Sequence, residues 1–166
     1  RWDTEALHQT NMTDLKRHPE EMGIDRLDNE SRVLSNETDS IRLLGVENWG
    51  NPPFPQKGEL DVALKGVDDS EFSILMSHDP DHWAAKTLKN TKKIGLTLAG
   101  HTHGMQFGIE IPGFIWSPVK YKYPRWAGIY KEKGQYLYVN RGFGYIGYPG
   151  RFGIWPEITI IELQKA

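Results

Sequence analysis

Two apolar segments that each run into a histidine constrain this chain more than any other feature of its sequence. The first is residues 73–78 (SILMSH), and the second is residues 94–104 (IGLTLAGHTHG). Short apolar runs bounded by turn residues are typical of buried strands. Open α/β sheets place their ligand sites at the carboxyl ends of parallel strands. We therefore expect His78, His101 and His103 to lie at one edge of a sheet and to be candidate metal ligands.

The spacing of His101 and His103 makes a further prediction about the number of ions. On extended backbone these residues share a face, with Cα atoms roughly 6.5 Å apart at about 3.3 Å per residue. That separation is wide for one chelated ion, but it suits two ions held about 3.5–4 Å apart, as in two-metal hydrolytic sites. Gly100 and Gly104 let the backbone approach ions or substrate oxygens without a Cβ in the way. The spacing predicts that each histidine serves a different metal ion.

The two motifs resemble those of a known family. The sequence SHDP at residues 77–80, followed by AGHTHG at residues 99–104, resembles the last two metal-binding motifs of the calcineurin-like metallophosphoesterases. Residues 140–144 (NRGFG) and 156–158 (PEI) resemble the closing segment of the family's bacterial branch, which often follows a membrane anchor. The resemblance covers Asp39 to Leu163.

This resemblance implies a fold, an activity and a ligand set. The fold is an α/β sandwich with mixed sheets, and the activity is metal-dependent hydrolysis of a phosphate monoester or diester. The cofactors would be two divalent ions, such as Mn, Fe or Zn. By the same resemblance, His78 and His101 would serve one ion and His103 the other. The family commonly has glycine where Met105 stands, so that side chain is expected to narrow the approach to the ions.

Three motifs of the family do not occur in this sequence. They are D-x-H, G-D-x-x-D and G-N-H-D or G-N-H-E, which supply the remaining metal ligands and the histidine thought to assist the leaving group. Residues 1–3 resemble sequence that follows shortly after the third motif. We therefore interpret residues 1–166 as a single, partial domain, the C-terminal portion of a longer protein. Its catalytic residues would lie upstream, and the chain alone would be inactive.

Composition excludes some classes of partner and ligand. The 20 basic and 22 acidic residues give a formal charge of −2, which offers no basic field for nucleic acid. Because there is no cysteine, only His, Asp, Glu and Asn can hold a metal. No apolar run approaches the roughly 20 residues needed to span a bilayer. Any membrane association would come from an upstream anchor, and the localisation stays open.

The periodic and turn signals predict the remaining elements. Residues 3–22 read as a helix in two pieces, capped by Asp3 and Asn11 and interrupted near Pro19. The other expected elements are a hairpin over residues 32–46, an irregular loop at 47–55 on the rim of the site, a helix over 59–67, a strand over 105–111, a hairpin over 127–140 and a last strand over 157–163.

The residues after His78 need a decision, because His78 and His82 have the spacing of a helical metal pair. Asp79 precedes Pro80, which disfavours helical geometry at Asp79, so the helix is expected to begin at Pro80 with Asp79 as its cap. His78 then lies outside the helix and His82 inside it. We expect His82 to pack in the first turn or face solvent, and not to bind metal.

Arg141 and the stretch 116–126 each have two possible roles. Arg141 is a candidate substrate ligand, since guanidinium geometry suits phosphate oxygens, but a structural ion pair is the alternative. The stretch 116–126 interleaves aromatic residues with Lys120, Lys122 and Arg125. It could bind a membrane or protein surface, which would make the protein a non-catalytic binding module, or it could be a loop folded over the sheet.

Overall fold

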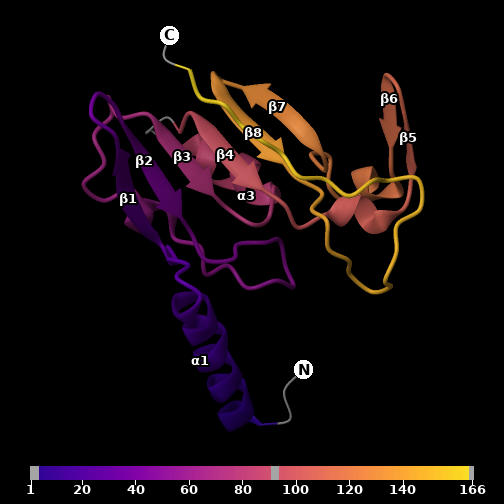
Figure 1. Ribbon diagram of the computed structural model, residues 1–166, viewed down its shortest axis with the longest axis horizontal. Helices are drawn as coiled ribbons and strands as arrows, with labels where there is room; N and C mark the ends of the chain where they lie inside the picture. Colours follow the sequence, from indigo (N-terminus) through magenta and orange to yellow (C-terminus); the bar gives the residue numbers. More distant parts are fainter. Residues whose placement is uncertain (1–3, 91–93, 165–166) are drawn as a thin grey trace.

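A computed structural model of the protein describes residues 4–90 and 94–164. Within them the main element is a six-stranded mixed sheet with strand order β1-β2-β3-β4-β8-β7 (Figure 1). The pairs β2–β3, β3–β4 and β4–β8 are parallel, while β1–β2 and β7–β8 are antiparallel hairpins. The predicted α/β class with a mixed sheet and both predicted hairpins are confirmed. The strands are Glu30–Ser35 (β1), Ser40–Gly45 (β2), Ser73–Met76 (β3), Leu96–Ala99 (β4), Gly128–Glu132 (β7) and Gln135–Val139 (β8).

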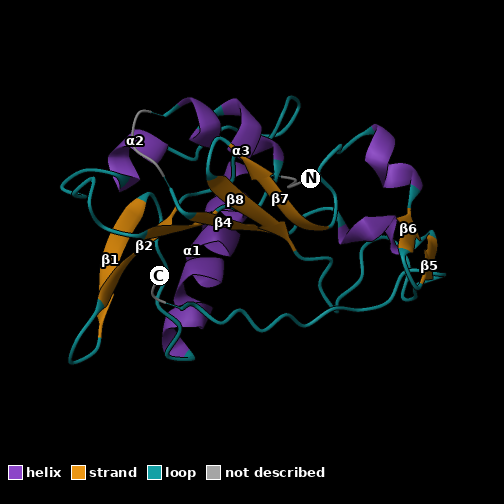
Figure 2. Ribbon diagram, turned by 90° about the horizontal axis from the view of Figure 1, so that it is seen from above, coloured by secondary structure: helices purple, strands orange, loops and turns teal. Residues whose placement is uncertain are grey.

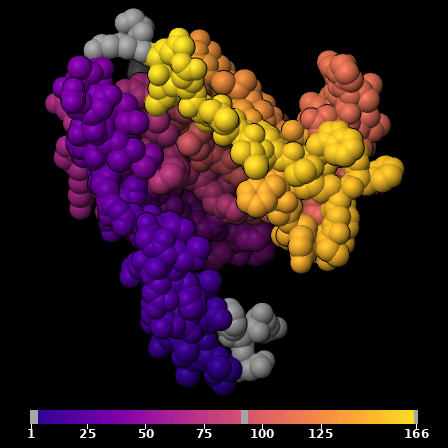
Figure 3. All heavy atoms as spheres, in the orientation of Figure 1, coloured from indigo at the N-terminus to yellow at the C-terminus, as the bar shows by residue number. Residues whose placement is uncertain are grey.

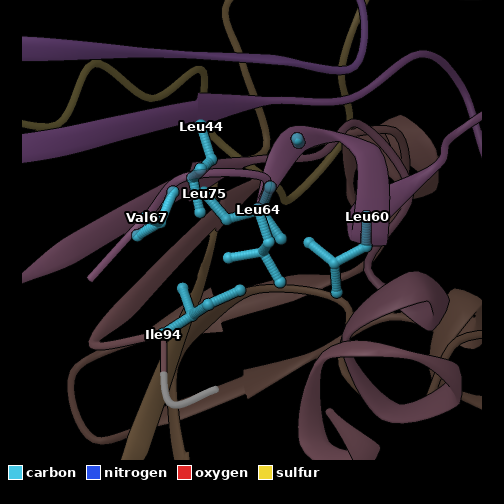
Figure 4. Close-up of a cluster of buried hydrophobic side chains, with 7 residues drawn as sticks. Leu44, Leu60, Leu64, Val67, Leu75 and Ile94 are labelled. Carbon is cyan, nitrogen blue, oxygen red and sulfur yellow. The ribbon is translucent and has the colours of Figure 1, made fainter. Parts of the chain in front are cut away.

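The first half of the sheet is held by an apolar cluster on the face covered by helix α2 (Leu60–Ala63). Figure 4 shows side chains from this helix and its C-terminal turn directed at those of the strands. The predicted helix over 59–67 is shorter than expected, because Gly66 adopts a left-handed conformation (φ 73°) just after the first turn. Four apolar residues of this segment, spaced three or four apart or adjacent, are nevertheless buried: Leu60, Ala63, Leu64 and Val67. The cluster comprises Leu44, Leu60, Ala63, Leu64, Val67, Leu75 and Ile94.

A second apolar cluster lies under α3 (Asp81–Ala85) and the 3₁₀ turn η1 (Thr87–Lys89). Trp83 of α3 packs with Leu88 and with Leu137 and Val139 of β8. Figure 2 shows α2 and α3 on the same side of the sheet, with the C-terminal segment on the other side. Parallel strands are usually covered on both faces, so the central strands read as continuous apolar runs.

The N-terminal helix α1 (Glu5–Glu21) differs from the prediction. It is one continuous helix, and its cap is Thr4, whose hydroxyl accepts a hydrogen bond from the Leu7 N–H. The predicted cap Asp3 lies outside the described residues. Pro19 sits in the last turn, where the helix is already ending, so it does not divide the helix in two. The helix buries no residue and projects away from the sheet (Figures 1 and 3).

Two predicted strands after the histidine motifs are corrected. The first is only β5 (Ile109–Ile111), which pairs with β6 (Phe114–Trp116) in a separate two-stranded sheet, because residues 103–106 form the 3₁₀ turn η2. The strand expected over 157–163 is not formed, and residues 155–164 run as an irregular segment. Ile158 and Ile160 there are 82% and 94% exposed. Among the described residues, no helix has the length and apolar character that crossing a bilayer requires.

Candidate metal centre

The ends of β3 and β4 bring His78 and His101 together. The two strands are parallel neighbours, and their pairing continues past the last ladder residues, where Gly100 N–H donates to the His78 carbonyl at 3.0 Å. His78 Nε2 lies 3.2 Å from His101 Nδ1, and the two rings meet edge to face with centroids 5.1 Å apart. Two histidines distant in sequence thus present one ring nitrogen each to the same small space.

The donor pair fits a divalent ion. Two imidazole nitrogens bound to one tetrahedral zinc at about 2.0–2.1 Å lie roughly 3.3 Å apart, close to the separation seen here. Metal binding also requires neutral imidazole. Burial lowers the pKa of His78, and the neighbouring His101 lowers it further, although Asp79 opposes this. At neutral pH the His78 side chain is therefore in the form that binds a metal.

The extended geometry expected for His101 and His103 is wrong. Strand β4 ends at Ala99, and the loop then turns sharply, with φ of 68° at His101 and 50° at His103. The Thr102 N–H donates to the Gly100 carbonyl at 2.7 Å, which closes the turn. Left-handed backbone is uncommon outside glycine, and such conformations concentrate at functional sites. A turn, and not alternation along a strand, therefore sets the directions of the two imidazoles.

His103 begins η2, the turn that follows His101 and Thr102. Its Nδ1 is buried without a hydrogen-bond partner among the residues that the structure describes. Burial lowers its pKa, with contributions from Arg151 and His101. Residues 4–90 and 94–164 contain no group of three or more His, Asp or Glu side chains able to hold an ion. In the described residues, the candidate site therefore consists of one pair of facing imidazole nitrogens and one buried imidazole nitrogen without a partner.

Hydroxyl groups hold the histidine turn in place. Thr102 Oγ1 donates to the Trp126 carbonyl at 2.8 Å and accepts from the Gly104 N–H at 3.2 Å. Ser117 Oγ donates to the Gly104 carbonyl at 2.9 Å. Gly104 has φ of 57°, and a Cβ there would lie 2.9 Å from Ile154 Cγ2, so a larger residue would be strained and would displace the Ile154 side chain.

Two long polar side chains tie the turn to the glycine-rich loop 141–153. Gln106 is fully buried; its Nε2 donates to the carbonyls of Tyr148 (2.9 Å) and Gly150, and its Oε1 accepts from the Ile146 N–H. Arg151 donates to the carbonyls of His103, Arg141, Gly142 and Gly144 at 2.8–3.2 Å. The sequence analysis missed both residues. The one available signal was the glycine-rich loop itself, whose backbone groups lack ladder partners and need side-chain ones.

Arg141 lies between two carboxylates. Its Nε is 2.7 Å from Glu157 Oε2 and its Nη1 is 2.7 Å from Glu110 Oε2, with the side chain only 11% exposed. Burial acts to raise the pKa of Glu110, but the hydrogen bonds from Arg141 and the Trp155 N–H outweigh it, and the pKa is lowered. These contacts are those of the structural ion pair that was the alternative reading. The role of Arg141 as a phosphate ligand stays a prediction.

The helix after His78 begins one residue later than expected, at Asp81, with Pro80 in the N-cap position. Asp79, one residue before the N-cap, still contacts the first turn, because its Oδ1 accepts from the Asp81 N–H at 2.9 Å, and His78 lies outside the helix as expected. His82 is inside the helix and fully buried, with its Nδ1 2.8 Å from Ser77 Oγ and its ring 5.3 Å from that of Trp49. Burial, together with Lys86, lowers the pKa of His82 to about 4. Its packing in the first turn agrees with one of the two positions predicted.

The loop 47–55 reaches the site through one residue. Phe54 meets the His101 ring edge to face, with centroids 5.7 Å apart, as expected for a rim residue. Trp49, by contrast, is buried under the loop. The loop therefore covers one side of His101 while the strand ends approach it from another.

Comparisons with known proteins agree with the motifs. The chain is 37% identical over 117 residues to YkuE of Bacillus subtilis, named an uncharacterized metallophosphoesterase, covering 70% of this chain and 37% of that protein. It is 37% identical over 141 residues to an uncharacterized metallophosphoesterase of Helicobacter pylori J99, covering 79% and 35%. It is 28% identical over 144 residues to phosphodiesterase YaeI of Escherichia coli K12, covering 85% and 48%.

The extent of these matches matters as much as their identity. The aligned part of the chain spans about a third to a half of the length of these relatives. No family model and no solved structure matches the chain.

Proposed function

Because the chain belongs to the calcineurin-like metallophosphoesterase family, we propose that the protein to which it belongs is a metal-dependent phosphoester hydrolase. In this proposal residues 1–166 are the C-terminal part of the catalytic domain and carry its last two metal-binding motifs. The observation that carries the proposal is the 3.2 Å approach of His78 Nε2 to His101 Nδ1 at the ends of two parallel strands. If the two histidines only formed ion pairs or packed in the core, nothing would require their ring nitrogens to face each other at this edge of the sheet.

The roles of the residues follow from their positions. His78 and His101 would hold one divalent ion, and His103 a second. The chemistry that bound divalent ions supply in such sites is neutralisation of the phosphate oxygens and acidification of a water molecule. Phe54 and the turn 101–106 would exclude water from one side of the reacting group. Met105, half exposed beside His103, would narrow the approach for bulky substrates.

The same proposal explains why this chain would be inactive by itself. Three imidazoles would leave most coordination positions of two ions without ligands. Among the described residues, no group of three or more His, Asp or Glu side chains supplies the missing ligands. The sequence lacks the three motifs that would supply those ligands. Membrane association, if the complete protein has it, would come from a segment upstream of these residues.

A hydrolysis assay tests the proposal. The complete protein should hydrolyse bis(p-nitrophenyl) phosphate or p-nitrophenyl phosphate, and EDTA should abolish the activity until Mn²⁺ or Zn²⁺ is restored. The 166-residue chain should show no turnover under the same conditions. Turnover that survives both EDTA and His101→Ala would overturn the metal-dependent mechanism. Metal-dependent turnover by the 166-residue chain alone would overturn its assignment as an incomplete part.

The competing function is a non-catalytic module that binds a membrane or protein surface through residues 116–126. Two of its aromatic residues, Tyr123 and Trp126, are buried with Val119 and Ile154, so they do not form an open patch. Arg125 bonds Glu132 at 3.2 Å and stacks over Trp83. This arrangement favours the loop reading. Sedimentation with anionic vesicles, with and without Lys120, Lys122 and Arg125, distinguishes the two: binding that needs these charges and ignores EDTA would favour the module.

A further inference from the structure

The second ring nitrogen of His101 faces two oxygen atoms from different parts of the chain. His101 Nε2 lies 2.7 Å from the Tyr123 hydroxyl and 3.7 Å from Asp79 Oδ2. Both partners are buried, with 8% and 1% of their surface exposed. On the opposite side of the same ring, Nδ1 faces His78. The two nitrogens of His101 therefore have distinct surroundings, one rich in oxygen and one occupied by another imidazole.

These surroundings bear on where the proton of neutral His101 lies. A neutral imidazole carries one N–H and one lone pair, and the proton resides on the nitrogen whose neighbours accept it. An ionised carboxylate can only accept, and a phenol oxygen can accept as well as donate. The carboxylate thus favours a proton on Nε2, where the Tyr123 oxygen is placed to accept it, and this leaves the lone pair on Nδ1, directed toward His78.

We infer that Tyr123, with Asp79 beside it, is a positioning residue that holds His101 as its Nε2–H tautomer and directs the Nδ1 lone pair at the ion shared with His78. Hydrogen bonds to the free nitrogen of a ligating histidine fix its tautomer and orientation in many metal sites. The inference rests on the proposed metal role of His78 and His101. It adds a residue, Tyr123, from a segment that neither histidine motif includes.

The two oxygens are held rigidly enough for this role. Tyr123 follows the 3₁₀ turn η3 (Pro118–Tyr121), where its N–H donates to the Val119 carbonyl at 2.8 Å. Its ring packs with Val119, Trp126 and Ile154 and meets His101 edge to face at 5.1 Å. Asp79 is held through its other oxygen, Oδ1, which accepts from the Asp81 N–H at 2.9 Å in the first turn of α3. The hydroxyl and the carboxylate thus reach His101 from two separate elements.

The test compares Tyr123→Phe with Tyr121→Phe in the complete protein. The first variant removes only the hydroxyl, and the second is a matched control, because Tyr121 is 78% exposed. Long-range ¹H–¹⁵N spectra of ¹⁵N-histidine-labelled protein, stripped of metal, report the tautomer of each histidine. Competition with a chromophoric chelator, using Zn²⁺ alone, reports the affinity for the ion. Circular dichroism checks that each variant is folded.

Tyr123→Phe should move His101 from the Nε2–H form toward a mixture of tautomers and weaken the affinity for one Zn²⁺ ion by roughly tenfold to a hundredfold. Asp79→Asn keeps an oxygen that can accept from the Asp81 N–H. It should shift the His101 tautomer ratio and the Zn²⁺ affinity in the same direction, but by less. Tyr121→Phe should change neither. Unchanged tautomer and affinity in Tyr123→Phe would overturn the inference if His78→Ala still loses zinc. If His78→Ala keeps its zinc, the proposed metal role fails instead, and the tautomer spectra still decide whether Tyr123 orients His101.

Discussion

The sheet and the loops at its carboxyl edge are stabilised in different ways. In the sheet, Leu44, Leu75 and Leu137 are completely buried, and backbone groups pair in regular ladders. In the loops, Gln106 and Arg151 satisfy carbonyls that no ladder reaches. Apolar burial therefore decides where the histidine-bearing strands end, while polar contacts between distant segments decide where the imidazoles point. Stability and site geometry should respond to different mutations.

The largest effect on stability is expected in the sheet. Leu75→Ala removes a fully buried side chain at the centre of the first apolar cluster and leaves a cavity, so the free energy of unfolding should fall by about 3 kcal/mol. Val33→Ala on β1, where the side chain is 49% exposed, is the control and should change it by less than about 0.5 kcal/mol. Urea denaturation with unchanged m-values measures both. Similar losses in the two variants would contradict a core centred on Leu75.

The next effect is a pH-dependent loss of stability that arises from His82 in helix α3. His82 has a folded-state pKa of about 4, against an ordinary value of 6.5. Above pH 6.5 both states are neutral and the group contributes nothing. As pH falls from 6.5 toward 4, only the unfolded state takes up the proton, and stability should fall by roughly 1.4 kcal/mol per pH unit.

The variant His82→Gln isolates this contribution. Urea denaturation at pH 7.5, 6.0 and 5.0 should show a shallower loss of stability on the acid side than in the unmodified protein. The comparison at pH 7.5 corrects for the lost contact with Ser77, since protonation plays no part there. Equal slopes in the two proteins would show that His82 is not held neutral by burial.

A smaller and more local effect is expected in the loops. Gln106→Ala leaves the Ile146 N–H and the carbonyls of Tyr148 and Gly150 without their partner, which should lower stability by about 1–2 kcal/mol. Hydrogen exchange should show faster exchange of amides in residues 144–152 and unchanged protection in β3 and β4. Gln9→Ala on the exposed helix α1 is the control. Loss of protection across the sheet would contradict the separation of the two regions.

The smallest effect concerns backbone conformation at Met105. This residue has φ of 56°, which costs a non-glycine residue roughly 1–2 kcal/mol, whereas glycine loses roughly 0.5–1 kcal/mol of conformational entropy on folding. Met105→Gly should therefore raise the stability slightly, by a few tenths of a kcal/mol up to about 1 kcal/mol. Thermal unfolding would detect it. A decrease beyond about 0.5 kcal/mol would mean that the half-exposed side chain has a packing role.

The sequence predicted those features that local patterns determine. Apolar runs located the strands that lead to His78 and His101, Pro80 located the start of α3 to within one residue, and turn residues located both hairpins. The prediction of a strand over 157–163 was wrong because a strand needs a neighbouring strand to pair with, and none of the described strands pairs with Ile158 and Ile160. The turn at His101 and His103 could not be foreseen either, since side chains up to 50 residues away, including Ser117 and Arg151, fix it.

The central claim is that His78 binds one ion through Nε2 and His101 binds the same ion through Nδ1, while His103 binds a second ion. Anomalous diffraction at the metal absorption edge, from crystals of the complete protein, tests it most directly. We expect one peak within about 2.0–2.3 Å of both His78 Nε2 and His101 Nδ1, and a second peak on His103. A peak on His101 Nε2, a single ion shared by His101 and His103, or no peak near His78 would contradict the claim.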